Sequence, residues 1–269
     1  MVKRATDKDT FTAAYLTASC VLYAPPALYF ALRTSIPFAG WLCIIASGTL
    51  YSLYFLALGR AYFHGDLSVI YPVARGVGPV LTAIAGHLIL GERVTAAGAA
   101  GIALIAGSVF ALQVPVARPD REGAPVAALL WAGCVGALYA AYSIIDKQGV
   151  GVIRVHPFVY IYFAYAVSAL IVIPLIVLRH GLRRTLRDWW KDRTPAVLVG
   201  LLNIGAYTLV LIALSLPRSP VSYVVPLRTA SVLVGVLAGI RVLKEEGAVV
   251  RIAAACLVMV GVALIAWKG

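Results

Sequence analysis

The stretch GDLSVIYPVARGVGP, residues 65–79, places an arginine, Arg75, inside a long apolar segment. Apolar residues continue on both sides of it, from residue 67 to residue 90. A segment of this length is long enough to cross a hydrocarbon layer of about 30 Å as a helix. In such a helix Arg75 would lie about 12 Å below the membrane surface, where a charged side chain needs water or a partner.

The composition indicates that the chain as a whole is a membrane protein. Of the 269 residues, 62% are hydrophobic and 13% are charged, whereas about 25% are charged in soluble domains. Only helices satisfy their backbone in lipid at these segment lengths. We therefore expect an all-α integral membrane protein. Its about nine transmembrane helices are predicted at residues 11–33, 38–58, 67–90, 94–113, 124–145, 157–179, 195–215, 219–243 and 248–267.

Most of the basic residues that give the net charge of +12 lie in the short loops between these segments. No basic stripe with interleaved aromatic residues is present, so the pattern argues against nucleic acid as a partner. Fifteen Lys and Arg residues fall on one side of the predicted topology and six on the other. The positive-inside rule then predicts a multi-pass protein of the cell membrane, with a cytoplasmic N-terminus and an external C-terminus.

Polar stretches separate the segments. One of them, DKQGVGVIRVHP at residues 146–157, is interpreted as a loop, and RDWWKD at residues 187–192 is interpreted as an anchor at the membrane surface. The four cysteines lie in apolar segments without CxxC spacing, and the histidines show no metal-ligand spacing. No metal or cofactor is expected.

The two halves of the chain are related by an internal repeat. Residues 67–112 align with residues 221–266 at a constant shift of 154, without a gap. Upstream, Tyr51 matches Tyr207 after a two-residue slip. The predicted units are a polar tail (1–10), a first repeat of four helices (11–113), a linker (114–123) and a second repeat of five helices (124–267). The aligned pairs are Ser68 with Ser222, Pro72 with Pro226, Glu92 with Glu246, and Gly107 with Gly261.

An odd number of helices in a repeat inverts the next copy in the membrane, which is the plan of many secondary transporters. The chain resembles the EamA type of the drug/metabolite transporter superfamily. The resemblance rests on residues 57–93, ALGRAYFHGDLSVIYPVARGVGPVLTAIAGHLILGER, and on residues 213–246, ALSLPRSPVSYVVPLRTASVLVGVLAGIRVLKEE. It implies two inverted repeats and, most commonly, export. The family pattern has five helices in each repeat, and the first repeat here lacks its first.

Arg75 has a near-symmetric counterpart in Arg228, which aligns with Ala74 and follows Pro226 as Arg75 follows Pro72. The two arginines are expected to line a central cavity and to bind a carboxylate or phosphoryl group through forked hydrogen bonds. A structural role, in which each holds backbone carbonyls or a polar neighbour, stays open. Pro72 and Pro226 are candidate hinges, because proline removes a helix hydrogen bond.

Further polar residues are candidates for functional roles because of their position in the apolar segments. Tyr71, Tyr51 and Tyr207 are candidate substrate-stacking residues, with packing as the alternative. Asn203 is a candidate cavity contact or a contact between helices. The candidates for a gate or for proton coupling are Glu92, Glu246 and His87, and the alternative for the glutamates is an exposed helix end.

These features predict secondary-active transport, most commonly export, of a small anionic or zwitterionic metabolite by alternating access. The alternative is a non-transporting membrane subunit or sensor derived from a transporter. An enzyme is not expected, because no set of nucleophile and base is found at membrane depth. The expected partners are the lipid bilayer, a small-molecule substrate and a coupling proton or ion. The small residues at 94–113 and 248–267 predict close helix contact, either between repeats or in a homodimer.

Overall fold

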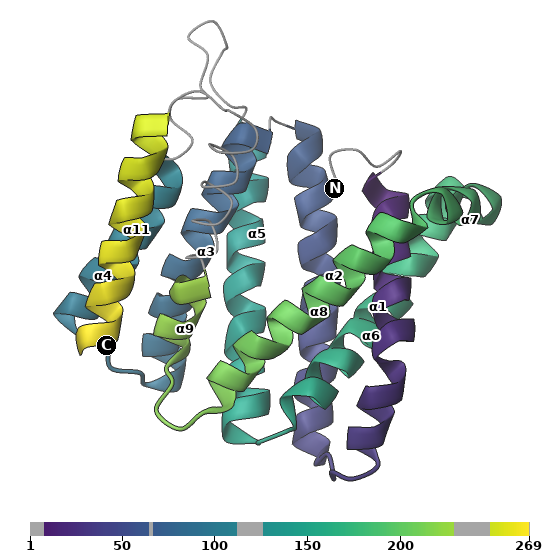
Figure 1. Ribbon diagram of the computed structural model, residues 1–269, viewed down its shortest axis with the longest axis horizontal. Helices are drawn as coiled ribbons and strands as arrows, with labels where there is room; N and C mark the ends of the chain where they lie inside the picture. Colours follow the sequence, from purple (N-terminus) through teal and green to yellow (C-terminus); the bar gives the residue numbers. More distant parts are fainter. Residues whose placement is uncertain (1–7, 65–66, 112–125, 229–247, 269) are drawn as a thin grey trace, which may run out of the picture. The chain divides into compact units, whose positions relative to one another are not determined.

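The computed structural model describes residues 8–64, 67–111, 126–228 and 248–268, and this part contains helices and connecting loops without any strand (Figure 1). The membrane-spanning candidates and shorter helices follow one another along the chain. They are α1 (Lys8–Ala31), α2 (Phe38–His64), α3 (Leu67–Leu90), α4 (Ala96–Ala111), α5 (Val126–Asp146), the π-helix η3 (Lys147–Val152), α6 (Pro157–His180), α7 (Leu182–Lys191), α8 (Arg193–Ser215), α9 (Val221–Arg228) and α11 (Ala248–Lys268).

The described helices begin and end close to the predicted apolar segments. Within the described residues, four helices are long and apolar enough to cross a membrane: Asp9–Ala31, Phe38–Ala61, Pro157–His180 and Arg193–Ser215. Shorter apolar helices cover Gly76–Leu90, Ala96–Ser108 and Ile252–Trp267. The multi-pass helical architecture is therefore present, while the number nine stays a prediction. The predicted linker and most of the polar tail lie outside the described residues.

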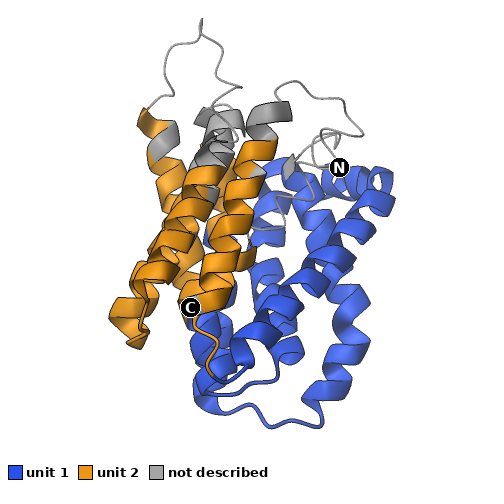
Figure 2. Ribbon diagram, turned by 60° about the vertical axis from the view of Figure 1, so that its left-hand side comes forward, with its two compact units in different colours: residues 1–53, 145–217 blue, residues 54–144, 218–269 orange. Residues whose placement is uncertain are grey.

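The chain divides into two compact units, which Figure 2 shows in blue and orange. Unit 1 comprises residues 1–53 and 145–217, and unit 2 comprises residues 54–144 and 218–269. Each unit therefore contains segments from both predicted repeats. In unit 1, α1 packs against α6, α7 and α8, and α8 also contacts η3. In unit 2, α4 packs against α3 and α11, and α9 packs against α3.

The contact between α4 and α11 in unit 2 depends on glycine. A Cβ atom at Gly101 would lie 2.7 Å from the carbonyl oxygen of Gly261, and a Cβ atom at Gly261 would lie 2.7 Å from the carbonyl oxygen of Gly101. The two backbones can therefore approach only without side chains at this crossing. Ile105 and Ile265 fill the adjacent core. Close contact between the two small-residue helices, which belong to different predicted repeats, is thus present inside the chain.

The prediction of a loop from residue 146 was wrong. Helix α5 continues through Asp146, and the chain then forms η3, whose residues Gly149 and Val150 are buried. A side chain at Gly149 would overlap the ring of Tyr160, so glycine lets η3 pack directly against α6. The glycines that suggested a loop are needed for close helix packing. This extension determines where the Asp146 side chain lies.

Candidate functional site

A carboxylate lies buried in unit 1, surrounded by hydroxyl groups. The side chain of Asp146 is fully buried, and Tyr51 and Tyr207 both donate to its Oδ2 atom at 2.7 Å. Ser47 donates to Oδ1 at 2.5 Å. The hydroxyl of Tyr160 interacts with the same carboxylate and donates to the carbonyl oxygen of Cys43 at 3.2 Å. We call the residues Ser47, Tyr51, Asp146, Tyr160 and Tyr207 the Asp146 cluster.

Four helices supply the Asp146 cluster. Ser47 and Tyr51 are one turn apart on the same face of α2, so their hydroxyls can reach one carboxylate. Asp146 is the last residue of α5, where the helix widens into η3. Single π-helical turns occur frequently at functional sites. Tyr160 and Tyr207 enter from α6 and α8, and all five side chains are buried.

The depth of the cluster follows from the position of Tyr51. This residue is the middle one of α2, thirteen residues from Phe38 and thirteen from His64. At 1.5 Å per residue, it lies about 20 Å along the helix axis from either end. Because the Tyr51 hydroxyl donates a hydrogen bond to it, the Asp146 carboxylate lies level with the middle of a membrane-spanning helix. Transporters of this plan hold substrate and coupling ions near the midplane.

The repeat relates the two tyrosines of the cluster. Tyr51 of the first repeat and Tyr207 of the second are the matched positions found in the sequence, and their rings lie edge to face, with centroids 5.8 Å apart. Both hydroxyls reach the same oxygen atom of Asp146. A single carboxylate therefore joins matched residues of the two predicted repeats within unit 1.

The hydroxyl groups of the Asp146 cluster are compatible with a carboxylate that binds and releases a proton. An unpaired buried carboxylate is costly, and hydroxyl donors compensate for its lost hydration. A hydroxyl group can also accept a hydrogen bond, so the same partners can serve a protonated carboxyl group after rotating. Among the described residues, no group of three or more metal-ligating side chains occurs. The cluster thus contains one carboxylate in a setting that can support both of its protonation states.

Asn203 lies near the cluster and connects two helices. Its amide nitrogen donates to the hydroxyl of Tyr165 at 2.9 Å, which joins α8 to α6. The ring of Tyr165 lies 5.7 Å from that of Tyr51. The structure therefore brings three predicted site residues, Tyr51, Asn203 and Tyr207, into one neighbourhood of unit 1. Asn203 makes the contact between helices that was one of its two predicted roles.

The predicted arginines belong to unit 2. Arg228 ends α9, and its guanidinium lies 5.8 Å from the ring centroid of Tyr139 on α5, within cation–π range. Arg75 and the neighbouring Tyr71 and Pro72 lie in α3, but their side chains are outside the described part of the chain. Their predicted binding and hinge roles stay predictions. The partner hinge residue, Pro226, is buried within α9.

Glu92 makes a specific set of contacts in unit 2. Its carboxylate accepts hydrogen bonds from the backbone N–H groups of Val221 and Ser222, at 2.7 and 2.9 Å, and from the Ser222 hydroxyl at 2.5 Å. It therefore caps the N-terminus of α9, where the helix dipole favours negative charge. The Nδ1 atom of His87 lies 2.8 Å from the Glu92 carbonyl oxygen. Glu246 lies outside the described residues.

Asp146 was missed because the sequence places it directly before two polar residues and a glycine, residues 147–149. The string DKQGVG has the composition of a loop, and an acidic residue at the edge of an apolar segment is usually a solvated helix end. One signal was available. Tyr51 and Tyr207 were matched across the repeat, and two symmetric tyrosines at membrane depth need a hydrogen-bond partner. The sequence order does not reveal that Asp146 is this partner.

Comparisons with known proteins agree with this architecture. The model of the EamA-like transporter family matches residues 126–267, and the model of the Small Multidrug Resistance protein family matches residues 28–105. A crystal structure of a protein shares the fold with a TM-score of 0.78 at 18% identity, over 99% of this chain and 91% of that chain. No curated protein matches. Both families consist of membrane transporters and not of enzymes. The chain belongs to the EamA-like transporter family.

Proposed function

We propose that this membrane transporter is a secondary-active exporter of a small anionic or zwitterionic metabolite, and that it exchanges the substrate for protons bound at Asp146. The observation that carries the proposal is the carboxylate of Asp146, fully buried and held by Ser47, Tyr51 and Tyr207. Ionisable side chains inside a membrane are costly and mark ion or proton pathways. The position of Tyr51 in the middle of α2 supports a site near the midplane.

The proton chemistry requires that Asp146 binds and releases a proton during each cycle. In the ionised state, the three hydroxyl groups donate to the carboxylate, and such charge-assisted bonds are about twice as strong as neutral ones. In the protonated state the carboxyl group donates its own proton to one of these oxygens. Both states therefore keep their hydrogen bonds, and the exchange does not require an unpaired buried charge.

The titratable and charged groups around Asp146 are consistent with this role. Tyr51, Tyr160 and Tyr207 face it from α2, α6 and α8, and Cys43 lies nearby on α2. On its own segment, the Nζ atom of Lys147 donates to the carbonyl oxygen of Leu214 at 2.8 Å. Phenols and thiols are neutral at physiological pH. Lys147 is therefore the one of these named groups that carries a charge.

The substrate class is proposed from the arginines. Arg228 lies at the end of α9 beside Tyr139, and the repeat places Arg75 at a near-equivalent point of α3. Guanidinium groups bind carboxylates and phosphates in a forked geometry, and an aromatic ring keeps the group oriented. Export is proposed from the likeness of residues 28–105 to the multidrug resistance family. Inverted repeats supply two exchangeable arrangements for alternating access.

Transport in proteoliposomes tests the proposal. The purified protein is reconstituted, and labelled amino acids, organic acids and phosphonates are offered individually, with and without an imposed pH gradient. Liposomes without protein serve as the control. We expect at least one anionic or zwitterionic compound to be exchanged, and its net movement to follow the pH gradient in the antiport direction.

The other outcomes contradict the proposal in distinguishable ways. If the exchange rate is the same at every pH gradient, the protein transports the substrate without coupling it to protons. A preference for cationic compounds would contradict the proposed anionic or zwitterionic substrate class. If nothing in the panel moves while the protein remains folded, the alternative of a non-transporting membrane subunit or sensor is favoured.

A further inference from the structure

Helix α7 connects two membrane-spanning candidates and lies beside them. It follows α6, which ends at His180, and precedes α8, which begins at Arg193. Since both neighbours are long enough to cross the membrane, α7 lies at the level of a membrane surface. Its ten residues, LRRTLRDWWK, have strongly separated polar and apolar faces. The proposed transport function does not use this helix.

One face of α7 is fixed to α1 within unit 1. Thr185 and Asp188 are buried, and the hydroxyl of Thr10 donates to Asp188 Oδ2 at 3.5 Å. The indole N–H of Trp189 donates to the carbonyl oxygen of Ala14 at 3.3 Å. The hydroxyl of Thr185 donates to the carbonyl oxygen of Gly181 at 3.0 Å. The orientation of α7 is therefore determined by its buried face.

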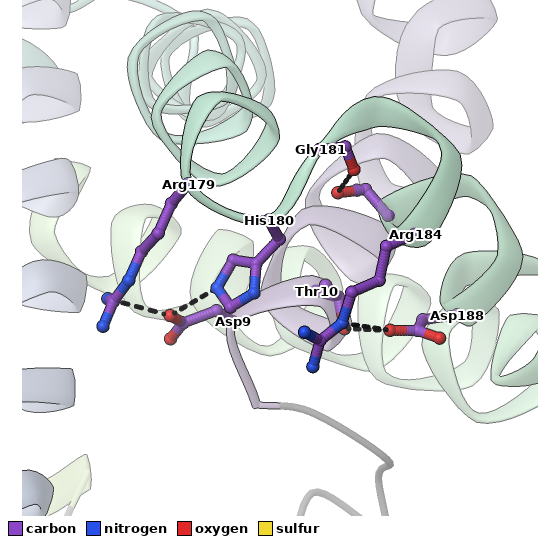
Figure 3. A network of polar contacts seen from close by, with 8 residues as sticks. Asp9, Thr10, Arg179, His180, Gly181, Arg184 and Asp188 are labelled. Atoms are coloured by element: carbon purple, nitrogen blue, oxygen red, sulfur yellow. Dashed lines mark hydrogen bonds and ion pairs between the residues drawn. The ribbon is translucent and has the colours of Figure 1, made fainter.

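Polar contacts and ion pairs hold the beginning of α7 in the same position. Figure 3 shows Asp9 between Arg179 and His180, each 3.2 Å from its Oδ2 atom, and shows Arg184 directed toward Asp188. The Nε atom of Arg184 lies 3.8 Å from Asp188 Oδ2. These contacts join the N-terminal end of α1 to the α6–α7 connection. The remaining faces of α7 are thus presented in a fixed orientation.

The first exposed face of α7 is apolar. Leu182, Leu186 and Trp190 recur every four residues and therefore lie along one stripe of the helix. Their side chains are 57%, 54% and 62% exposed. Leucines exposed to water in a row are unfavourable, whereas the boundary between headgroups and acyl chains accepts them. Tryptophan is enriched at this boundary.

The second exposed face is basic and adjoins the apolar one. Arg183, Arg187 and Lys191 also recur every four residues, each one position after a member of the apolar stripe. Arg187 approaches Asp188 at 3.5 Å but remains 76% exposed. Residues 179–193 contain six basic and two acidic side chains. The basic stripe therefore faces the same boundary as the apolar stripe with an excess of positive charge.

We propose that α7 is an interfacial helix that binds the headgroups of anionic phospholipids. The apolar stripe enters the acyl boundary, and the basic stripe contacts the phosphates beside it. An apolar stripe next to a basic stripe on a helix at the membrane surface is the pattern of helices that lie in the interface. Three basic residues near an anionic surface give a preference on the order of a hundredfold over a neutral one. Such binding would hold the ends of α1, α6 and α8 at a fixed depth.

Lipid selection by the full-length protein tests this inference. The protein is reconstituted in vesicles of equal parts phosphatidylglycerol and phosphatidylcholine and extracted gently, and the co-purified lipids are quantified. We expect wild type to enrich phosphatidylglycerol and the variant Arg183→Gln/Arg187→Gln/Lys191→Gln to lose most of this enrichment. The variant Arg183→Lys/Arg187→Lys keeps the charge and should retain it. Thermal stability and gel filtration confirm that each variant is folded.

A matched control removes the same charge elsewhere. The variant Arg33→Gln/Arg93→Gln/Arg154→Gln changes three exposed arginines outside α7 and should keep the enrichment. Absence of enrichment in wild type, or an equal loss in the control, would overturn the inference. Equal stabilisation of the protein by inorganic phosphate or glycerol phosphate would assign the basic stripe to a soluble anion and also overturn it. None of these results depends on whether a substrate is transported.

Discussion

Tyr51 and Tyr207, which occupy matched positions in the two predicted repeats, donate hydrogen bonds of 2.7 Å to the same oxygen atom of Asp146. The carboxylate of Asp146 is thus shared by two matched hydroxyls. A change at this carboxylate therefore acts on a segment of each repeat at once. This relationship makes Asp146 the centre of the proposed proton exchange.

Removing either tyrosine hydroxyl tests that relationship. In Tyr51→Phe and Tyr207→Phe the ionised carboxylate loses one donor, so the proton stays bound to higher pH. A hydrogen bond to a charged group contributes about 1.5–3 kcal/mol, which corresponds to an upward shift of about one to two pH units. We expect the pH profile of substrate exchange to shift by this amount in each variant.

A neighbouring tyrosine supplies the control. The hydroxyl of Tyr165 accepts a hydrogen bond from Asn203, and its ring contacts that of Tyr51, so Tyr165→Phe alters the same region without removing a donor from Asp146. Its pH profile should match that of wild type. An equal shift in all three variants would show that the profile reports packing and not the Asp146 hydrogen bonds.

The cap formed by Glu92 leads to a prediction about stability. Glu92→Ala leaves the backbone N–H groups of Val221 and Ser222 without their acceptor, and a lost cap or unsatisfied donor costs about 1–3 kcal/mol. We expect a lower melting temperature of the detergent-solubilised protein. The exposed neighbour provides the control, since Arg93→Ala should leave the melting temperature unchanged. Unchanged stability of Glu92→Ala would favour a gating role without a structural one.

The helix crossing between α4 and α11 can be tested with two glycines of α4. In Gly101→Ala the new methyl group would lie 2.7 Å from the Gly261 carbonyl oxygen, and overpacking of this kind costs about 1–3 kcal/mol. At Gly107 a methyl group meets no atom within 4 Å, and alanine favours the helix. Thermal unfolding should therefore show destabilisation by Gly101→Ala and none by Gly107→Ala. The reverse order would contradict the described crossing.

The lowered pKa of His156 leads to a prediction of how the stability of the protein depends on pH. Its ring stacks on Phe30 at 4.7 Å, its Nδ1 atom is buried without a hydrogen-bond partner among the described residues, and burial lowers its pKa below the usual 6.5. The unfolded chain therefore binds a proton more readily than the folded one as the pH falls below 6.5. Stability that is present above this pH is lost as the pH falls through the folded-state pKa.

Melting temperatures measured between pH 7.5 and pH 5 check this expectation. In His156→Phe the stacking surface remains and the titrating group is gone, so the decrease toward acidic pH should be smaller than in wild type. His87→Gln removes an exposed histidine instead and should keep the wild-type slope. If both variants keep the slope, other groups cause the acid sensitivity.

The helices were largely predictable, because apolar length determines what can cross a membrane. The predicted start and end of α3, at residues 67 and 90, agree with the structure. The predicted segment at residues 219–243 began two residues before α9, which begins at Val221, the position that aligns with Leu67 at the start of α3. Hydropathy and repeat symmetry act over many residues, so single polar positions do not obscure them.

The site was less predictable, because it depends on single side chains meeting across helices. Tyr51, Tyr207 and Asn203 were candidates as polar groups at membrane depth, and they lie together in unit 1. Asp146 was missed because the local composition after it is that of a loop, although the chain forms η3 there. No periodicity identifies the helices that will pack on a buried carboxylate. Long-range packing therefore supplied the information that the sequence lacked.

The most direct test of proton exchange at Asp146 is a comparison of Asp146→Asn with wild type in proteoliposomes. The asparagine side chain keeps the size of aspartate and can accept hydrogen bonds, but it does not bind a proton at physiological pH. The measurement is uptake of a substrate found in the exchange panel, recorded with a pH gradient and, separately, as exchange without one. We predict that Asp146→Asn retains exchange and loses gradient-driven uptake. Gradient-driven uptake equal to that of wild type would contradict the assignment of the proton to Asp146.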